Sequence, residues 1–376
     1  MPTINRSFNL FSASAACTVA LALPGVASAQ SVDATLPSTT SAPKVYVFPL
    51  IGQMGTDISE TSFEVITKDL DKSKPDIIVF QLKSADIDRN DYLKNDNPAE
   101  FGLPGEVGTY RQMLKDVRDK YRDIPQVVWV QDAVGISSLF ALGWPRMYMI
   151  SDARLFGLYR FKQMVESQWE DPDVRSKMVA AWTGIMKGLV EVGGYPREVA
   201  DALIFPENRL SVSFEGRGAK WASDTSGVWV VDSSEEAPCG FNAQLSEDTM
   251  LSDGTADSFD DLMYLLGYRE FQKIDSGEKI GEQFVKEWRK AMDECFKNLE
   301  DAQETEDSVV GLGKRKNLYE KTIALMKRYP MIEKRMEMQQ RGVSIIALEG
   351  AVDDIKKEIQ RQREAEKQGR QGGGGG

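Results

Sequence analysis

Two adjacent serines, Ser137 and Ser138, lie in a small-residue turn that follows a β-branched and aromatic run at 126–130. A serine hydroxyl becomes a nucleophile when a nearby base takes its proton. The chain has no histidine among its 376 residues, which excludes Ser-His-Asp and Cys-His sites and removes the commonest metal ligand. Any catalysis must therefore use lysine, carboxylates or the backbone.

The segments that would position these serines alternate between strand and helix patterns. Near-continuous apolar runs predict strands covered on both faces of a sheet, and the runs between them have helix periodicity. In chain order the segments are 44–51, 59–70, 76–82, 108–121, 126–130, 139–144 and 147–150. This alternation predicts βαβ units on a mostly parallel sheet, in an α/β domain over 44–270.

The first 29 residues predict a secretory signal peptide. Arg6 supplies a positive start, residues 10–23 are apolar and small, and Ala27-Ser28-Ala29 fits the cleavage rule. The apolar stretch is shorter than the roughly 20 residues that span a bilayer, so cleavage is favoured over an uncleaved anchor. We expect an exported protein, in the periplasm or outside the cell, with no integral membrane segment after cleavage.

Composition divides the remaining chain. Residues 30–43 are a linker rich in Ser, Thr, Pro and Ala, residues 280–366 are charged and helical, and residues 367–376 form a Gly-rich tail.

The charge balance is acidic. The formal net charge is −12, and loss of Arg6 with the signal lowers it by one, so nucleic acid and anionic membranes are poor partners. Cys239 and Cys295 remain in the mature chain, where an oxidising compartment leaves two alternatives, a disulfide or two free thiols.

Other motifs do not form sites. Residues 253–257 resemble the start of a calcium loop, but Ser258 and Tyr264 stand where an EF-hand requires Gly and Glu. Ser258 with Asp261 instead fits a helix N-cap. We expect no metal and no cofactor.

Residues 212–231 are a β-rich run broken by glycine turns, which predicts a hairpin or small added sheet. Its Phe214, Trp221 and Trp229 are either local core or an exposed aromatic face for a partner.

The C-terminal region has apolar residues at spacings of three and four, which is a heptad pattern. The pattern predicts either self-association and a partner helix, or an amphipathic helix that packs on its own domain. Its members are Ile345, Leu348, Val352, Ile355 and Ile359.

The order of VYVFPLIGQMGTDIS, PDIIVFQL, PQVVWV with its small-residue turn, and MYMISDARLFG resembles the ClpP/crotonase superfamily. Within it, the chain is most similar to the NfeD-type, signal-peptide-peptidase-like branch. The resemblance covers residues 44–270 and implies a ClpP/crotonase-like ββα-superhelix core, with homo-oligomers as in that superfamily.

In that branch a serine nucleophile is paired with a lysine base, and Lys177 falls where the lysine would lie. An ungapped match places Gly135 at the nucleophile position, so Ser137 or Ser138 reaches it only if the short helix has lost two residues. The alternatives are that Lys177 is a solvated helix residue and that both serines allow close packing of a helix on the sheet.

The resemblance also implies an oxyanion hole after the second core strand, formed by a Gly-Gly pair. This chain has Ser84, Ala85, Asp86 and Ile87 there. A carboxylate beside a developing oxyanion has the wrong sign, and loss of one donor costs about 10²-fold in rate.

Two functions follow. The favoured one is a catalytically degenerate Clp-fold scaffold that binds a peptide or protein through its cleft and helical arm. The alternative is a Ser-Lys peptidase in which Ser137 or Ser138 is the nucleophile and Lys177 is the base.

Overall fold

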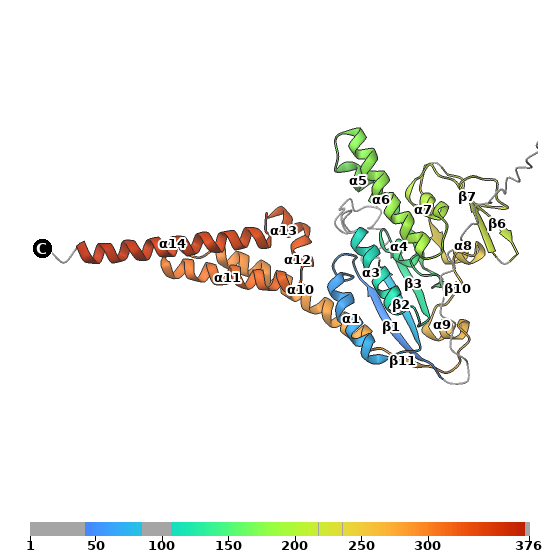
Figure 1. Ribbon diagram of the computed structural model, residues 1–376, viewed down its shortest axis with the longest axis horizontal. Coiled ribbons are helices and arrows are strands. Elements are labelled where there is room, and N and C mark those ends of the chain that lie inside the picture. Colours follow the sequence, from blue (N-terminus) through green and yellow to red (C-terminus); the bar gives the residue numbers. More distant parts are fainter. Residues whose placement is uncertain (1–41, 85–106, 217, 235, 373–376) are drawn as a thin grey trace, which may run out of the picture. The chain divides into compact units, whose positions relative to one another are not determined.

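The computed structural model describes residues 42–84, 107–216, 218–234 and 236–372 (Figure 1). The predicted signal peptide, most of the linker at 30–43 and the end of the Gly-rich tail lie outside these residues. None of the described helices is long and apolar enough to cross a membrane.

The core is a mixed α/β fold around an eight-stranded, mostly parallel sheet with the order β10-β4-β3-β2-β1-β11. β5 adds in parallel to β3, and β9 adds antiparallel to β5. The strands are β1 (Lys44–Ile51), β2 (Ile77–Ser84), β3 (Gln126–Val134), β4 (Met147–Met149), β5 (Arg154–Phe156), β9 (Phe241–Asn242), β10 (Gly254–Thr255) and β11 (Gln272–Ile274). The predicted α/β class and mostly parallel sheet are confirmed.

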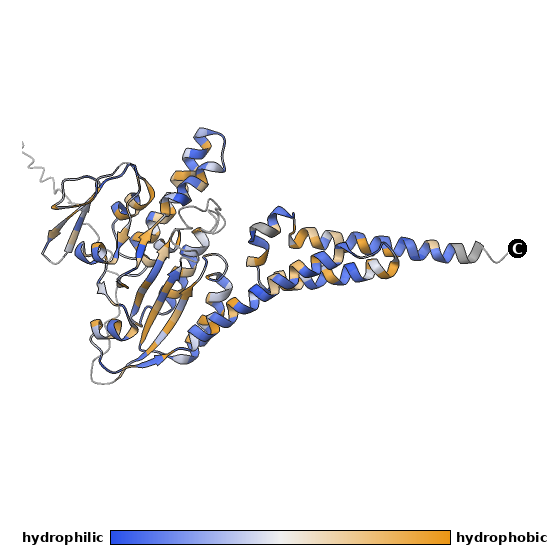
Figure 2. Ribbon diagram, turned by 180° about the vertical axis from the view of Figure 1, so that it is seen from behind, coloured by the Kyte–Doolittle hydropathy of each residue, from blue (hydrophilic) through white to orange (hydrophobic). Residues whose placement is uncertain are grey.

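Helices cover both faces of this sheet, because its strands are apolar on both sides. Alternate residues of β1 divide between the two packed clusters: Tyr46 and Phe48 face one, and Val45 faces the other. Figure 2 shows the hydrophobic colours concentrated on these strands. The covering helices are α1 (Glu60–Ser73), α3 (Val107–Lys120), α4 (Ser137–Ala141), α5 (Leu158–Ser167), α6 (Pro172–Val192), α7 (Arg197–Ile204), α8 (Ala243–Asp248) and α9 (Phe259–Leu265).

A second, three-stranded antiparallel sheet has the order β7-β6-β8. Its strands are β6 (Leu210–Glu215), β7 (Gly218–Ala222) and β8 (Trp229–Asp232). The added sheet predicted over 212–231 is therefore present. Trp221 packs edge-on against Phe241 of the core, whereas Phe214 and Trp229 are exposed.

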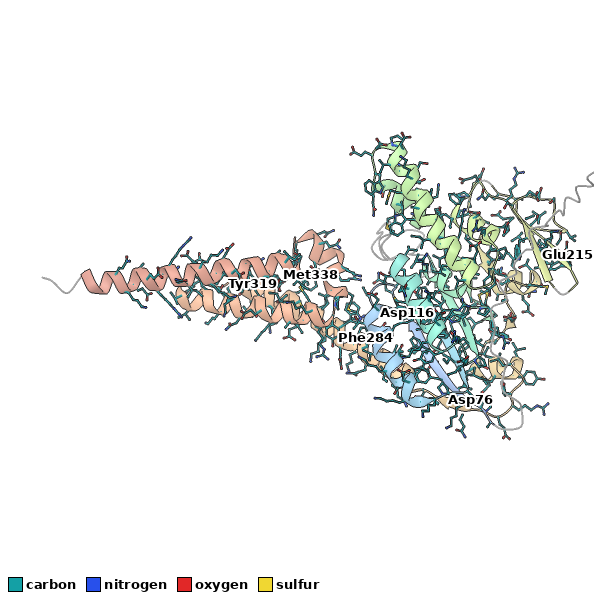
Figure 3. The ribbon with its side chains drawn as sticks, viewed as in Figure 1. Asp76, Asp116, Glu215, Phe284, Tyr319 and Met338 are labelled. Atoms are coloured by element: carbon teal, nitrogen blue, oxygen red, sulfur yellow. The ribbon has the colours of Figure 1, made fainter. Side chains whose placement is uncertain are left out.

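The C-terminal helices are α10 (Ser276–Gln303), α11 (Val309–Arg328), α12 (Met331–Lys334), α13 (Met336–Gln340) and α14 (Ile345–Gly372). We call α10 from Phe284 onward, together with α11 to α14, the arm. Phe284, Tyr319 and Met338 mark it in Figure 3. Leu348, Val352 and Ile355 of the heptad pattern are buried, and α14 packs on α11. The structure therefore shows packing within the chain, which is one of the two predicted alternatives.

The observed boundaries differ from the predicted ones. β11 pairs with β1 beyond residue 270, and the first turns of α10 pack on β1 and α1. At the other end, α14 stays helical to Gly372, past the predicted start of the tail at 367.

Candidate functional site

The two predicted nucleophiles are the first residues of α4, and both are completely buried. The Ser137 hydroxyl lies 2.9 Å from the carbonyl of Ser84 and 2.8 Å from that of Val134. The Ser138 hydroxyl lies 3.1 Å from the carbonyl of Ala133 and 3.2 Å from that of Phe156. Both hydroxyls therefore donate to strand-end carbonyls and join α4 to β2, β3 and β5.

Lys177 lies in the second turn of α6 and is exposed to solvent. A Ser-Lys dyad needs a direct hydrogen bond between hydroxyl and amine. In the part of the chain that the structure describes, neither serine makes such a bond to Lys177. The geometry gives the dyad no support.

Ser84, the last residue of β2, is buried, and its carbonyl already accepts from Ser137. Ala85, Asp86 and Ile87, the rest of the predicted oxyanion region, lie outside the described residues. The turn before α4 does carry a left-handed residue, Gly135, with φ 67°, which glycine adopts without steric cost.

Ligands of parallel sheets bind beyond the carboxyl ends of the strands. In this chain the loop after β1 carries a buried carboxylate there, Asp57, whose side chain is 1% exposed. It accepts hydrogen bonds from the backbone amide of Gln53 at 3.0 Å, the Trp288 indole at 3.0 Å and the Arg289 guanidinium at 2.8 Å. A buried carboxylate persists when it is paired and hydrogen-bonded in this way.

The backbone of the loop is shaped around this carboxylate. Gly52 has φ 102°, and a Cβ there would lie 2.3 Å from Oδ2 of Asp57. The guanidinium of Arg335 reaches the same loop from the arm and donates to the Gln53 side chain at 2.7 Å. Asp57 and Gln53 thus receive bonds from two separate parts of the arm.

A second carboxylate holds the start of α10. Asp69 of α1 accepts from the Ser276 hydroxyl at 2.5 Å and from the Tyr46 hydroxyl at 2.9 Å. Burial and the neighbouring Asp69 raise the pKa of Tyr46 above its usual range. A Cβ on Gly277 would lie 2.6 Å from the Val47 carbonyl, so α10 and β1 are in close contact.

Between β1, α1 and α10 lies a cavity of about 420 Å³, which we call the junction cavity. Its volume falls within the range of about 300–1,000 Å³ that small-ligand pockets occupy. It is lined by both apolar and charged residues. The apolar lining is Pro49, Ile51, Ile66 and Val285; the charged residues are Asp57, Glu278, Glu282, Lys286 and Arg289.

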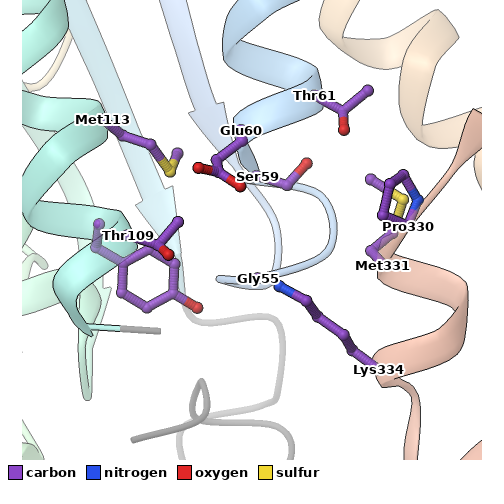
Figure 4. Close-up of a pocket in the computed structure, with 10 residues that line it drawn as sticks. Gly55, Ser59, Glu60, Thr61, Thr109, Met113, Pro330, Met331 and Lys334 are labelled. Carbon is purple, nitrogen blue, oxygen red and sulfur yellow. The ribbon is translucent and has the colours of Figure 1, made fainter. Parts of the chain in front are cut away.

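A smaller cavity of about 60 Å³ lies where α12 meets the starts of α1 and α3 (Figure 4). Ser59, Thr109 and Met331 are among its lining residues. Ser59 caps α1, and its side chain accepts from the Ser62 backbone amide in a capping box. Hydrogen bonds therefore fix the start of α1 beside this cavity.

Asp57, Trp288 and Arg289 were not found by sequence reasoning. The one local signal was a Gly-x-x-Gly turn, Gly52 to Gly55, ahead of an aspartate. Nothing in the pattern links that aspartate to a tryptophan 231 residues away.

The two cysteines among the described residues are free and buried, Cys239 in the core and Cys295 in the arm. Burial, followed by a nearby carboxylate, raises the pKa of each to about 12. Among the described residues no cluster of acids and cysteines could hold a metal ion.

No protein-family model matches the chain, and no curated protein matches it. Among solved structures, it is similar to a serine-to-alanine mutant of the 1510-N membrane-bound stomatin-specific protease, with a TM-score of 0.34 and 13% identity, over 60% of this chain and 85% of that one. The chain is also similar to a lysine-to-alanine mutant of that protease in complex with a substrate peptide. That match has a TM-score of 0.35 and 11% sequence identity, over 60% of this chain and 80% of the protease. Similarity at this level does not show what activity this chain has. What the structure shows is a mixed α/β fold with a mostly parallel sheet.

Proposed function

We propose that this chain is a Clp-like α/β scaffold without peptidase activity, which binds a peptide or protein segment at the junction cavity. The observation that carries the proposal is the complete burial of Ser137 and Ser138, with both hydroxyls donating to backbone carbonyls. A nucleophile must reach the substrate carbonyl, whereas both of these hydroxyls are buried.

The junction cavity suits a segment with an apolar side chain. Ile51 is partly exposed in its wall beside Pro49, so an apolar group that entered would remove apolar surface from water. Lys286 and Glu282 also line the cavity, and neither makes an ion pair with any described residue. They are available for the polar backbone or charged ends of a peptide.

Export and self-association belong to the same proposal. The expected mature chain begins at Gln30, and the arm offers a long polar surface for contacts between copies. Mass spectrometry of the secreted protein gives its first residue, and light scattering gives its oligomeric state.

The loss of catalysis is tested with a fluorophosphonate probe, which labels activated serines. We expect no labelling of the mature chain above that of the Ser137→Ala and Ser138→Ala variants. Labelling of the wild type that disappears in one of these variants and in Lys177→Ala would establish the peptidase and end the scaffold proposal.

Binding is tested on a peptide array with the mature chain and the Ile51→Glu variant, which places a charge in the cavity wall. We expect peptides with apolar side chains to bind the wild type and to lose at least tenfold in affinity for the variant. The matched control is Val192→Glu, at an exposed position on α6. Equal binding to all three proteins would remove the cavity from the proposal.

A further inference from the structure

The strand β8 lies at one end of the three-stranded sheet. It pairs with β6 on one side, with Val212 opposite Trp229. Among the described residues, no strand pairs with its other side. Within the described part of the chain, the backbone groups along this outer edge thus have no partner strand, and such an edge is a template for another extended chain.

Exposed apolar side chains gather around this edge. Trp229 is 41% exposed, Val230 is 43% exposed, Val228 just before the strand is 84% exposed, and Phe214 on β6 is 41% exposed. Successive residues of a strand point to opposite faces, so Trp229 and Val230 offer apolar contact on both faces. β8 has no lysine or proline, the residues that commonly protect an edge.

The sheet behind this edge is held firmly. Val212 in the central strand is completely buried, and Trp221 in β7 packs on Phe241 of the core. The approach to β8 is fixed by the Ser211 hydroxyl, which accepts from the Gly227 amide at 2.9 Å, and by the Ser213 hydroxyl, which accepts from the Val228 amide at 3.2 Å. An incoming strand would meet a preformed edge.

The surrounding sequence is strongly acidic. Between Lys220 and Arg269 the chain contains no lysine or arginine. Asp224 stands before β8, Asp232 ends it, and the exposed Glu236 follows it. An occupant that carries positive charge is favoured over a neutral or acidic one.

We propose that the outer edge of β8 binds an extended segment of a partner protein, in which aliphatic or aromatic residues alternate with lysine or arginine, as an added β-strand. Main-chain hydrogen bonds provide affinity, and the alternate side chains provide specificity. A second copy of this chain is disfavoured, because pairing two β8 edges would bring two acidic segments together. This surface is separate from the junction cavity and goes beyond the function proposed for it.

The test uses the mature chain, residues 30–376, and a panel of seven-residue peptides that alternate valine or phenylalanine with lysine or arginine. Binding is measured by fluorescence anisotropy at low and high salt. We expect saturable binding that weakens with salt, and a loss of at least tenfold when alternate peptide amides are N-methylated, because methylation removes the donors that pair with β8.

The variant Val230→Lys places a charge on the edge and should lose at least tenfold in affinity. Ile346→Lys makes the same kind of change at a highly exposed position on α14 and should bind like the wild type. Circular dichroism checks that both variants are folded.

Three results would overturn the proposal: no binding by any peptide of the panel, equal binding by Val230→Lys or by N-methylated peptides, or a dimer in light scattering that Val230→Lys alone dissolves. The Ile51→Glu variant separates this site from the junction cavity, because it should leave binding at β8 unchanged.

Discussion

The indole nitrogen of Trp288 donates a hydrogen bond of 3.0 Å to Asp57, across 231 residues of sequence. The next residue, Arg289, pairs with the other oxygen of the same carboxylate at 2.8 Å. One buried side chain thus connects the loop after β1 with the helix that leads into the arm.

Asp57→Ala should lower the free energy of unfolding by about 2–4 kcal/mol, because it leaves a buried indole and a guanidinium without their acceptor. This loss of stability is smaller than the loss expected for a fully buried ion pair, because Arg289 is 51% exposed and water screens its charge. Urea unfolding measures the loss. Asp307→Ala, which removes an 85% exposed partner of Arg315, should change stability by less than about 0.5 kcal/mol. Equal effects at the two positions would contradict the role given to Asp57.

Gly277→Ala should destabilise the chain by about 1–3 kcal/mol, because its Cβ would meet the Val47 carbonyl at 2.6 Å and α10 would have to move. Gly350→Ala has open space around its Cβ within α14 and should stabilise by about 0.5–1 kcal/mol through helix propensity. Thermal unfolding of both variants measures the difference. A neutral Gly277→Ala would mean that α10 does not need its close contact with β1.

Ser137→Ala should cost about 1–2 kcal/mol of stability, since the buried Ser137 hydroxyl has the carbonyls of Ser84 and Val134 within hydrogen-bond distance and shares its one hydrogen between them. Ser176→Ala, at an exposed position of α6, should stay within about 0.5 kcal/mol. Urea midpoints distinguish the two. A stable, fully folded Ser137→Ala would contradict the structural role assigned to this hydroxyl.

Both thiols of the mature chain should resist alkylation in the folded state at pH 8, because burial raises the pKa of Cys239 and of Cys295 to about 12 and thiolates are the reactive form. Mass spectrometry after iodoacetamide treatment should find both thiols modified only in urea. Modification of either thiol without urea would show that its surroundings open in the native state.

Stability should fall as the pH rises from about 10 to 12. Burial, together with Asp253, raises the pKa of Tyr148 to about 12, whereas an unfolded tyrosine has a pKa of about 10. The raised value means that the unfolded chain loses its proton first, so the stabilisation is complete below about pH 10 and is lost towards pH 12. Tyr148→Phe should flatten the decline in urea midpoint, and the exposed Tyr264→Phe should leave it unchanged.

Much of the core could be predicted from sequence, because its strands are apolar on both faces and the helix periodicity between them is regular. The runs predicted at 44–51 and 76–82 correspond to β1 and β2, and the run at 126–130 lies within β3. Such patterns are local, and a parallel sheet follows from their alternation.

The site was less predictable, because it depends on contacts between distant residues. The sequence pattern made Ser137 and Lys177 candidates for a catalytic dyad. Whether they can form one depends on burial, which the pattern does not give: Ser137 is buried and Lys177 is exposed. For Asp57 the only signal was the Gly-x-x-Gly turn before it, and that turn does not predict burial, since a carboxylate in a turn is usually solvated. In the C-terminal region the heptad spacing correctly indicates which face of α14 is buried. The spacing alone does not distinguish packing on a partner helix from packing on α11 of the same chain.

The start of α10 packs on β1 and α10 also packs on α11, so one continuous helix joins the sheet to the arm. Close contact at Gly277 and the hydrogen bonds of Trp288 and Arg289 to Asp57 attach this helix to the core at two separate points. Through these bonds the same helix that starts the arm also holds the Asp57 loop in place, at the wall of the junction cavity.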